Sequence, residues 1–175
     1  SLFTVGEDIY ASATPSEEVS SLRTSTAEIE TFLVDNAASK DVAVGGYDAY
    51  EVSFTLKPQF EGKTKVTLCN ACGEKFSLEF DTENMTVLAD RSESGKMTRI
   101  KSFVLMPAAP LGLCNSSDGY DVDVFVDKCS VEVFVDGGRI AMTNLVFPSE
   151  SFDNIVFEST GESEISNMFI HKIGK

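Results

Sequence analysis

Apolar and polar residues alternate along most of this chain, and the alternation predicts β-strands. Within residues 50–57 every second side chain is apolar, which is the period of a strand with one buried face. The same pattern predicts shorter strands at residues 66–68, 76–80, 85–89, 100–106, 122–126, 131–135, 139–147, 154–158 and 165–173. Residues 16–23 are a weak helical candidate, and no segment predicts a helix of two or more turns.

Turn-forming sequences separate the predicted strands. They are Glu61-Gly62, Cys72-Gly73, Ser94-Gly95, Asp118-Gly119, Asp136-Gly137-Gly138 and Thr160-Gly161. About ten short strands with turns at regular spacing are typical of a sandwich or barrel. We therefore predict an all-β fold, a two-sheet antiparallel β-sandwich of the concanavalin or lectin-like jelly-roll type.

Residues 1–26 differ in character from the rest of the chain. Residues 1–10 read as one strand, which cannot be stable without a sheet to join. We therefore expect residues 1–14 to be the remaining strand of a preceding domain, and the chain, which starts at Ser1, to be a piece of a longer protein. Residues 15–26 are rich in Ser, Thr and Glu, as interdomain linkers often are, so the sandwich is expected to occupy residues 27–175.

Composition and charge exclude several classes of function. The chain has 175 residues, of which 42% are hydrophobic, so one domain with a substantial core is expected. The net charge of −14 argues against a nucleic-acid partner, because the phosphate backbone would be repelled. An acidic surface suits a neutral, hydroxyl-rich ligand, although solubility alone also explains it. No apolar run approaches the length of a membrane span, and nothing in the sequence indicates a cofactor.

The chain contains four cysteines: Cys69, Cys72, Cys114 and Cys129. Cys69 and Cys72 form a C-x-x-C pair, but a zinc site would need a second close pair, and a redox pair would open a helix. Because this pair joins two strand-like segments, we predict a hairpin loop with free or structural thiols, and a disulfide remains an alternative. The lone His171 and the aspartates near residue 120 lack metal-ligand spacing, so no metal site is expected.

Three segments carry a family resemblance. Residues 126–138, which read VDKCSVEVFVDGG, continue through Thr143 to Phe147-Pro148. This segment resembles the signature of the C-terminal domain of glycoside hydrolase family 32, which contains invertases, levanases and inulinases. Residues 88–95 are similar to the D-R-x-x-S-G turn of that domain, and residues 15–23 resemble the linker that leaves its catalytic propeller. Cys129 stands where the signature usually has Ser, and Asp136 where Asn is common.

The resemblance implies a parent enzyme that acts on β-fructofuranosides. In such enzymes a five-bladed propeller carries the catalytic acids in W-M-N-D-P-N-G, R-D-P and E-C motifs. None of these strings occurs here, and nothing marks the close pair of carboxyl groups that a retaining glycosidase needs. We therefore expect no catalytic residue in this chain. The resemblance further implies that residues 1–14 come from the propeller and that the parent is exported, to the periplasm, the cell surface or the medium.

Two residues of the signature are candidates for a binding role. Alternation sends Val133 and its apolar neighbours into the core, so Glu132 and Phe134 point to the opposite face. An outward Phe134 implies burial against something further, which makes it a candidate for the interface with the propeller. Glu132 is the candidate for a polar contact with a sugar or at the interface, and a solvated carboxylate is its simpler interpretation. Asp90-Arg91 is interpreted as a structural ion pair or turn contact.

Two functions remain open. The first is an accessory sandwich that packs against and stabilises a fructan-cleaving propeller of the same parent chain. The alternative is an autonomous carbohydrate-binding module for fructan or another oligosaccharide. Sugar platforms usually present exposed aromatic rings. The chain has four Tyr and no Trp, which favours the packing role.

Overall fold

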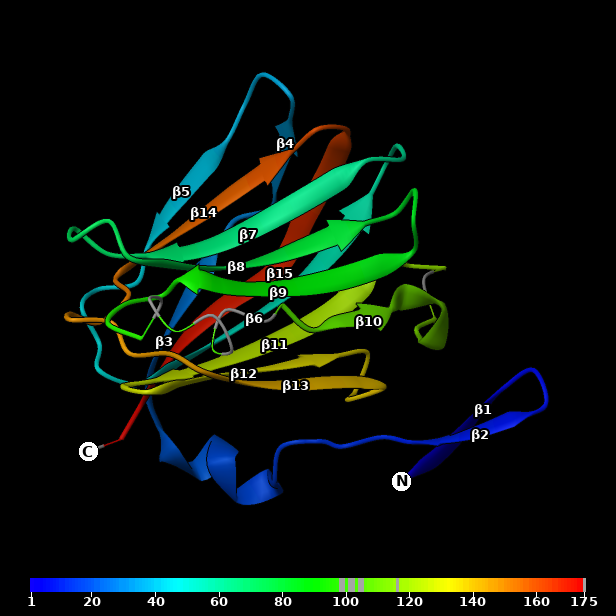
Figure 1. Ribbon diagram of the computed structural model, residues 1–175, viewed down its shortest axis with the longest axis horizontal. Helices are drawn as coiled ribbons and strands as arrows, with labels where there is room; N and C mark the ends of the chain where they lie inside the picture. The colour runs from blue at the N-terminus through cyan, green and yellow to red at the C-terminus, as the bar shows by residue number, and fades with distance from the viewer. Residues whose placement is uncertain (98–99, 101–102, 104–105, 116, 175) are drawn as a thin grey trace.

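The chain folds as two antiparallel β-sheets stacked face to face (Figure 1), in a computed structural model that describes residues 1–97, 100, 103, 106–115 and 117–174. The predicted all-β sandwich is confirmed. The six-stranded sheet has the order β10-β9-β8-β7-β14-β5. Its strands are β5 (Lys40–Ala43), β7 (Lys63–Cys69), β8 (Lys75–Asp81), β9 (Thr86–Glu93), β10 (Ala108–Pro110) and β14 (Asn154–Ser159).

The seven-stranded sheet has the order β13-β12-β11-β6-β15-β3, and β4 also pairs with β15. Its strands are β3 (Arg23–Ile29), β4 (Phe32–Asp35), β6 (Tyr50–Pro58), β11 (Tyr120–Asp127), β12 (Ser130–Val135), β13 (Ile140–Leu145) and β15 (Glu162–Ile173). Two short 3₁₀ helices complete the sandwich, η1 (Glu17–Leu22) and η2 (Leu111–Leu113). No helix among the described residues is both long enough and apolar enough to cross a membrane.

The core lies between the two sheets and follows the alternation of the sequence. Val131, Val133 and Val135 on β12 are completely buried. They belong to one cluster with large side chains of the opposite sheet, such as Phe76 and Phe157. Burying each such side chain stabilises the fold by about 1.5–3 kcal/mol. The outward positions of the same strand are therefore left to serve other contacts.

Several elements differ from the predicted ones. β3, β4 and β5 were not predicted, because β4 and β5 are only four residues long and β3 is exposed on both faces, so no alternation marks it. β3 begins at Arg23, inside the segment predicted to be linker. The weak helical candidate at residues 16–23 is the 3₁₀ helix η1. Most of the strand predicted at residues 100–106 lies outside the described residues.

The N-terminal residues form a hairpin instead of the predicted single strand. β1 (Leu2–Val5) pairs with β2 (Asp8–Ala11), and Gly6 in the turn has a φ of 61°. A two-residue hairpin turn needs such a positive φ, which glycine adopts without steric cost. Figure 1 shows the hairpin (dark blue) reaching away from the sandwich beside the end of β13.

Candidate functional site

The linker crosses the outer face of the seven-stranded sheet, and both candidate residues of the signature lie on that face. We call the surface formed by Glu51, Asp123, Phe125, Glu132 and Phe134 the linker face. Strand register explains the grouping, because directly paired residues point to the same side of a sheet. Glu132 pairs with Phe125, which pairs with Glu51, while Phe134 pairs with Asp123.

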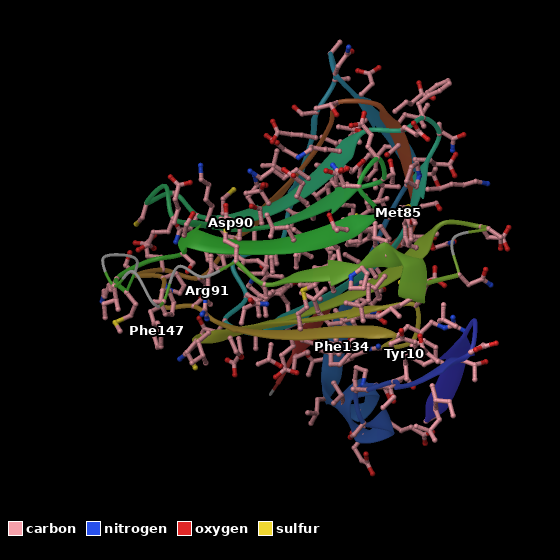
Figure 2. All side chains as sticks on the ribbon, turned by 45° about the vertical axis from the view of Figure 1, so that its right-hand side comes forward. Tyr10, Met85, Asp90, Arg91, Phe134 and Phe147 are labelled. Carbon is pink, nitrogen blue, oxygen red and sulfur yellow. The ribbon has the colours of Figure 1, made fainter. Side chains whose placement is uncertain are left out.

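Phe134 and Glu132 line a hollow of about 440 Å³ between the linker and this sheet. The linker side of the hollow is formed by Thr14, Pro15 and Val19. The Phe134 ring meets the Phe125 ring edge to face, with ring centroids 5.9 Å apart. Figure 2 shows Phe134 on the side of the sandwich that faces the N-terminal segment. The hollow is thus aromatic on its sheet side and bounded by the linker on the other.

An ion pair between the exposed Arg23 and a buried carboxylate holds the C-terminal part of the linker to the sheet. The Arg23 guanidinium donates from Nε and Nη2 to the two carboxylate oxygens of Glu51, at 2.7 and 2.6 Å. Glu51 is only 2% exposed. The hydrogen bond to Glu51 raises the pKa of Arg23, so the guanidinium stays charged. Two parallel hydrogen bonds fix the orientation of both groups, and so the direction in which the chain enters β3.

Asp123 lies on the same face without a hydrogen-bonded partner among the described residues. Its side chain is half-buried. Burial raises the pKa of this carboxyl group, the negative charge of Glu51 adds to the effect, and Arg23 partly opposes it. Asp123 is therefore a carboxylate of the linker face whose loss of hydration is not compensated by a hydrogen bond among the described residues.

His171 completes the row of outward residues beyond Glu51. Its Nδ1 atom is 2.8 Å from Thr26 Oγ1, and its ring is stacked on Phe169 with centroids 6.1 Å apart. Burial and the nearby Arg23 lower the pKa of the imidazole. The ring thus has a partner inside the sheet.

The chain just before the linker is held by the glycine turn of the signature. The Ala13 N–H donates to the carbonyl oxygen of Gly138 at 3.0 Å. Gly138 is buried with a φ of 77°, and a Cβ atom there would overlap the Ala13 carbonyl group. Beside it, the Arg139 guanidinium lies over the Phe3 ring, 4.7 Å from the centroid. The second glycine of the turn therefore permits a backbone approach that no other residue allows.

Asp136 has a structural role in the same turn. Its two carboxylate oxygens accept hydrogen bonds from the backbone N–H groups of Asn115 and Asp121, at 2.8 and 3.0 Å. Burial raises the pKa of Asp136, and these two hydrogen bonds oppose the shift. An Asn at this position offers one acceptor oxygen instead of two, so the departure from the family pattern brings an additional backbone contact.

The end of the signature, at Phe147, meets the motif of residues 88–95 at the end of β13 that lies away from Gly138. Gly95 and Phe147 form a β-bridge, and the Phe147 N–H donates to the carbonyl oxygen of Ser94 at 3.2 Å. Asp90 accepts a hydrogen bond from the Ser92 N–H at 2.8 Å, and the Arg91 guanidinium lies 4.4 Å from the Phe103 ring centroid. Asp90 therefore makes a turn contact. Figure 2 shows Asp90, Arg91 and Phe147 together at this end of the sandwich.

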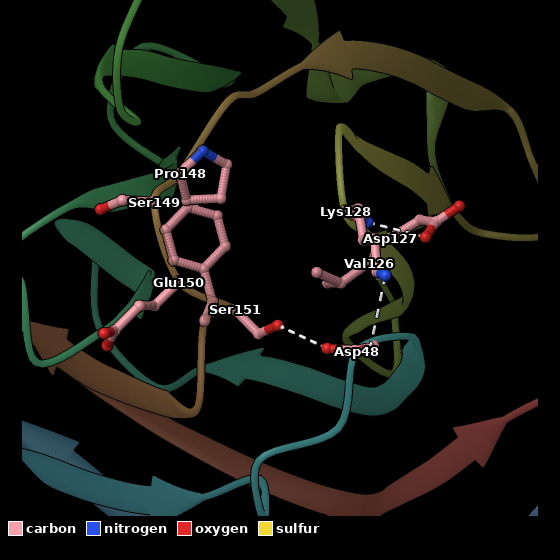
Figure 3. Close-up of a pocket in the computed structure, with 9 residues that line it drawn as sticks. Asp48, Val126, Asp127, Lys128, Pro148, Ser149, Glu150 and Ser151 are labelled. Atoms are coloured by element: carbon pink, nitrogen blue, oxygen red, sulfur yellow. Dashed lines mark hydrogen bonds and ion pairs between the residues drawn. The ribbon is translucent and has the colours of Figure 1, made fainter.

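A second hollow, of about 400 Å³, lies between three loops of the sandwich (Figure 3). Ser151 Oγ donates to Asp48 at 3.1 Å, and Lys128 Nζ lies 3.7 Å from the same carboxylate. The phenyl ring that lines it belongs to Phe152, which is only 1% exposed. None of the four tyrosines is exposed, and Phe60, an aromatic residue that is 67% exposed, lines neither hollow. The second hollow therefore presents no exposed aromatic platform, and the two rings that line the first, Phe125 and Phe134, are half-buried.

The four cysteines are free thiols, with Cys72 and Cys129 exposed. Cys69 and Cys72 flank the start of a hairpin loop between β7 and β8, as predicted. Burial raises the pKa of Cys114 to about 12. Within the described part of the chain, no group of three or more His, Cys, Asp or Glu side chains could hold a metal ion.

Sequence patterns did not reveal Arg23, Glu51 or Gly138 as the residues that fix the linker. Glu51 occupies a polar position in an alternating strand, so it reads as solvated, although it is buried. Arg23 is the last residue of the predicted linker motif, and only that motif drew attention to it. The pairing of Ala13 with Gly138 joins residues far apart in sequence, which local patterns do not report.

Comparisons with known proteins identify relatives of this architecture. The family model described as "Glycosyl hydrolases family 32 C terminal" matches residues 18–172. A levanase from Bacillus subtilis is 25% identical over 173 residues, which cover 97% of this chain and 25% of the levanase. An exo-inulinase structure from Aspergillus awamori superposes with a TM-score of 0.76 at 24% identity, over 99% of this chain and 34% of that one. A sucrose-6-phosphate hydrolase structure from Lactobacillus gasseri gives a TM-score of 0.72 at 19% identity, over 99% of this chain and 32% of that one. The chain thus spans between a quarter and about a third of these relatives.

Proposed function

The chain belongs to the C-terminal domains of glycosyl hydrolase family 32, and from this membership we propose that it is a non-catalytic accessory sandwich of a fructan- or sucrose-cleaving enzyme. In this proposal it packs against the catalytic propeller of the same parent chain and stabilises it. The relatives are three to four times longer than the stretch matched here, which leaves room for such a domain in the parent. The names of the levanase and the exo-inulinase support a parent that acts on β-fructofuranosides.

The observation that carries the proposal is the linker, which is held at both ends over an aromatic face. Just before it, Ala13 is hydrogen-bonded to Gly138, and near its end Arg23 is ion-paired with Glu51. A flexible tether would need neither contact. A linker fixed in this way sets the direction in which the preceding domain is attached, and it leaves Phe134 next to that attachment.

The N-terminal hairpin supports the same proposal. Leu2 and Ile9 are 74% and 69% exposed, although both are large apolar residues. A two-stranded hairpin is at best marginally stable alone, so its outer face needs a further sheet to cover it. We assign residues 1–14 to the propeller, with the hairpin as part of its sheet structure.

We also propose that the parent enzyme is exported. A polymer of fructose is too large to be taken up intact by most cells, so an enzyme that cleaves it works outside the cytoplasm. A strongly acidic protein is soluble outside the cytoplasm as well as inside it, so the net charge of −14 is compatible with this location.

Autonomous sugar binding is the alternative, and the hollow lined by Asp48, Lys128 and Ser151 is the feature that favours it. The hollow is large enough for a small ligand and carries both donors and acceptors. It lacks an exposed aromatic ring, so we prefer the packing role.

One pair of titrations distinguishes these functions. The purified chain is titrated with fructo-oligosaccharides and, separately, with the catalytic part of its parent, by isothermal calorimetry. We expect saturable binding to the catalytic part, none to the sugars, and no release of fructose from sucrose, inulin or levan. Saturable sugar binding with no binding to the catalytic part would replace the packing role by the carbohydrate-binding one.

A further inference from the structure

We propose that the catalytic part of the parent places a basic side chain, arginine or lysine, against Asp123 on the linker face. This inference rests on the packing role proposed above and adds the chemistry of the contact. It follows from the surroundings of Asp123, from the position of the linker and from the charge of this face.

Asp123 is already half-buried without a hydrogen-bonded partner in the described chain. Arg23 is the nearby cation, and its Nε and Nη2 atoms are bound to Glu51. A domain that covered this face would remove more water from the Asp123 carboxylate. Burying an ionised carboxylate is strongly unfavourable unless a cation or several donors replace the water. A covering surface that binds well must therefore supply such a group.

The aromatic residues around Asp123 favour a cation from the partner. Phe134 is directly opposite Asp123 on β12, and Phe125 is two residues along β11 on the same face. A guanidinium or ammonium group that reaches Asp123 can also contact the face of a neighbouring aromatic ring, which is a favourable arrangement. The surface thus combines an apolar contact with a carboxylate that can receive a positive charge.

The occupant of this surface is the part of the parent that precedes the sandwich. The linker runs from the hairpin to Arg23 along this face, so the preceding domain is attached beside it. The charge of the face agrees with a basic partner, because Asp121, Asp127 and Glu132 also point outward from β11 and β12. A second copy of this acidic chain would meet like charges there.

The test is the affinity of Asp123→Asn for the separately produced catalytic part of the parent. Asn keeps the shape and removes the charge, which leaves the partner's cation buried without a counter-ion. We expect binding to weaken roughly 30-fold or more. The matched control is Asp41→Asn, which removes an exposed carboxylate from β5 in the other sheet and should leave the affinity unchanged.

Thermal unfolding of the isolated variants separates this effect from a folding defect. Because burial disfavours the charged form of Asp123, Asp123→Asn should melt at the same or a higher temperature than the original chain. Equal affinities for Asp123→Asn and the original chain would overturn the inference and leave the packing role intact. Failure of the original chain to bind the catalytic part would overturn both.

Discussion

Replacing Gly138 by alanine should release the linker from the sandwich, whereas the same change at Gly137 should not. Both glycines have positive φ angles, 77° and 61°. An L-residue in that conformation costs about 1–2 kcal/mol, so both variants carry this strain. The two positions differ in what a Cβ atom would meet. At Gly137 no atom lies within 4 Å, and at Gly138 the Ala13 carbonyl group occupies the space.

The additional loss of stability in Gly138→Ala can be calculated from the contacts that Ala13 and its neighbours make. Moving this backbone breaks the Ala13–Gly138 hydrogen bond, which contributes about 1 kcal/mol net. The stacking of Arg139 on Phe3, both half-buried, is lost with it, at about 0.5–1 kcal/mol. Gly138→Ala should therefore destabilise the linker contact by about 1.5–2 kcal/mol beyond the strain that Gly137→Ala shares.

Amide hydrogen exchange at Ala13 is the direct assay, with thermal unfolding beside it. The strain alone should lower the melting temperature by about 2–8 °C in both variants, since 1 kcal/mol corresponds to about 2–4 °C for a domain of this size. The Ala13 amide should stay protected in Gly137→Ala and exchange freely in Gly138→Ala. Equal protection of Ala13 in the two variants would refute the argument that the turn holds the linker.

Three further predictions concern groups of the same sheet. Arg23→Ala should destabilise the chain by about 3 kcal/mol in urea unfolding, because it leaves the Glu51 carboxylate buried and unpaired, and Arg23→Ala with Glu51→Gln should recover part of the loss. Val133→Asp should unfold the domain, whereas Glu132→Ala should change stability by less than about 1 kcal/mol, and equal melting losses would mean that the faces of β12 are reversed. Asp136→Asn tests a pH dependence. Because the pKa of Asp136 is raised in the folded chain, its contribution to stability is full below the unfolded pKa of about 3.9 and declines as the pH rises through the folded pKa. The melting temperature of the original chain should therefore increase relative to that of Asp136→Asn as the pH is lowered.

The sequence was sufficient to predict the sandwich and the inward faces of its central strands. β11 and β12 are buried on one face, as is β6 apart from Glu51, so their alternation is complete and period-two reasoning applies to them. β3 could not be predicted in this way, because six of its seven residues are exposed and hydrophobic patterning has nothing to act on. The hairpin of β1 and β2 was read as one strand, although Gly6 marks its turn.

The residues that build the linker contact were harder to predict, for a different reason. Phe134 and Glu132 follow from alternation, since it gives the direction of a side chain. Whether an outward carboxylate is solvated or paired depends on what another segment brings to it. Arg23 reaches Glu51 from 28 residues away, and Ala13 reaches Gly138 across most of the chain. Such contacts depend on tertiary placement, which a single sequence does not encode locally.

The free edge of β3 has a consequence for the sandwich when it is separated from its parent. Among the described strands none pairs with the outer side of β3, and the stretch Thr24-Ser25-Thr26-Ala27 contains neither a charge nor a proline. An open strand edge of this kind is a template for aggregation, against which proteins usually place a lysine, a proline or a bulge. The pairing of β3 with β15 is irregular at Thr24, and the net charge of −14 adds long-range repulsion between copies. The colloidal stability of a truncated product would thus depend on its ionised carboxylates, and acidification would expose the edge to self-assembly before it unfolded the core.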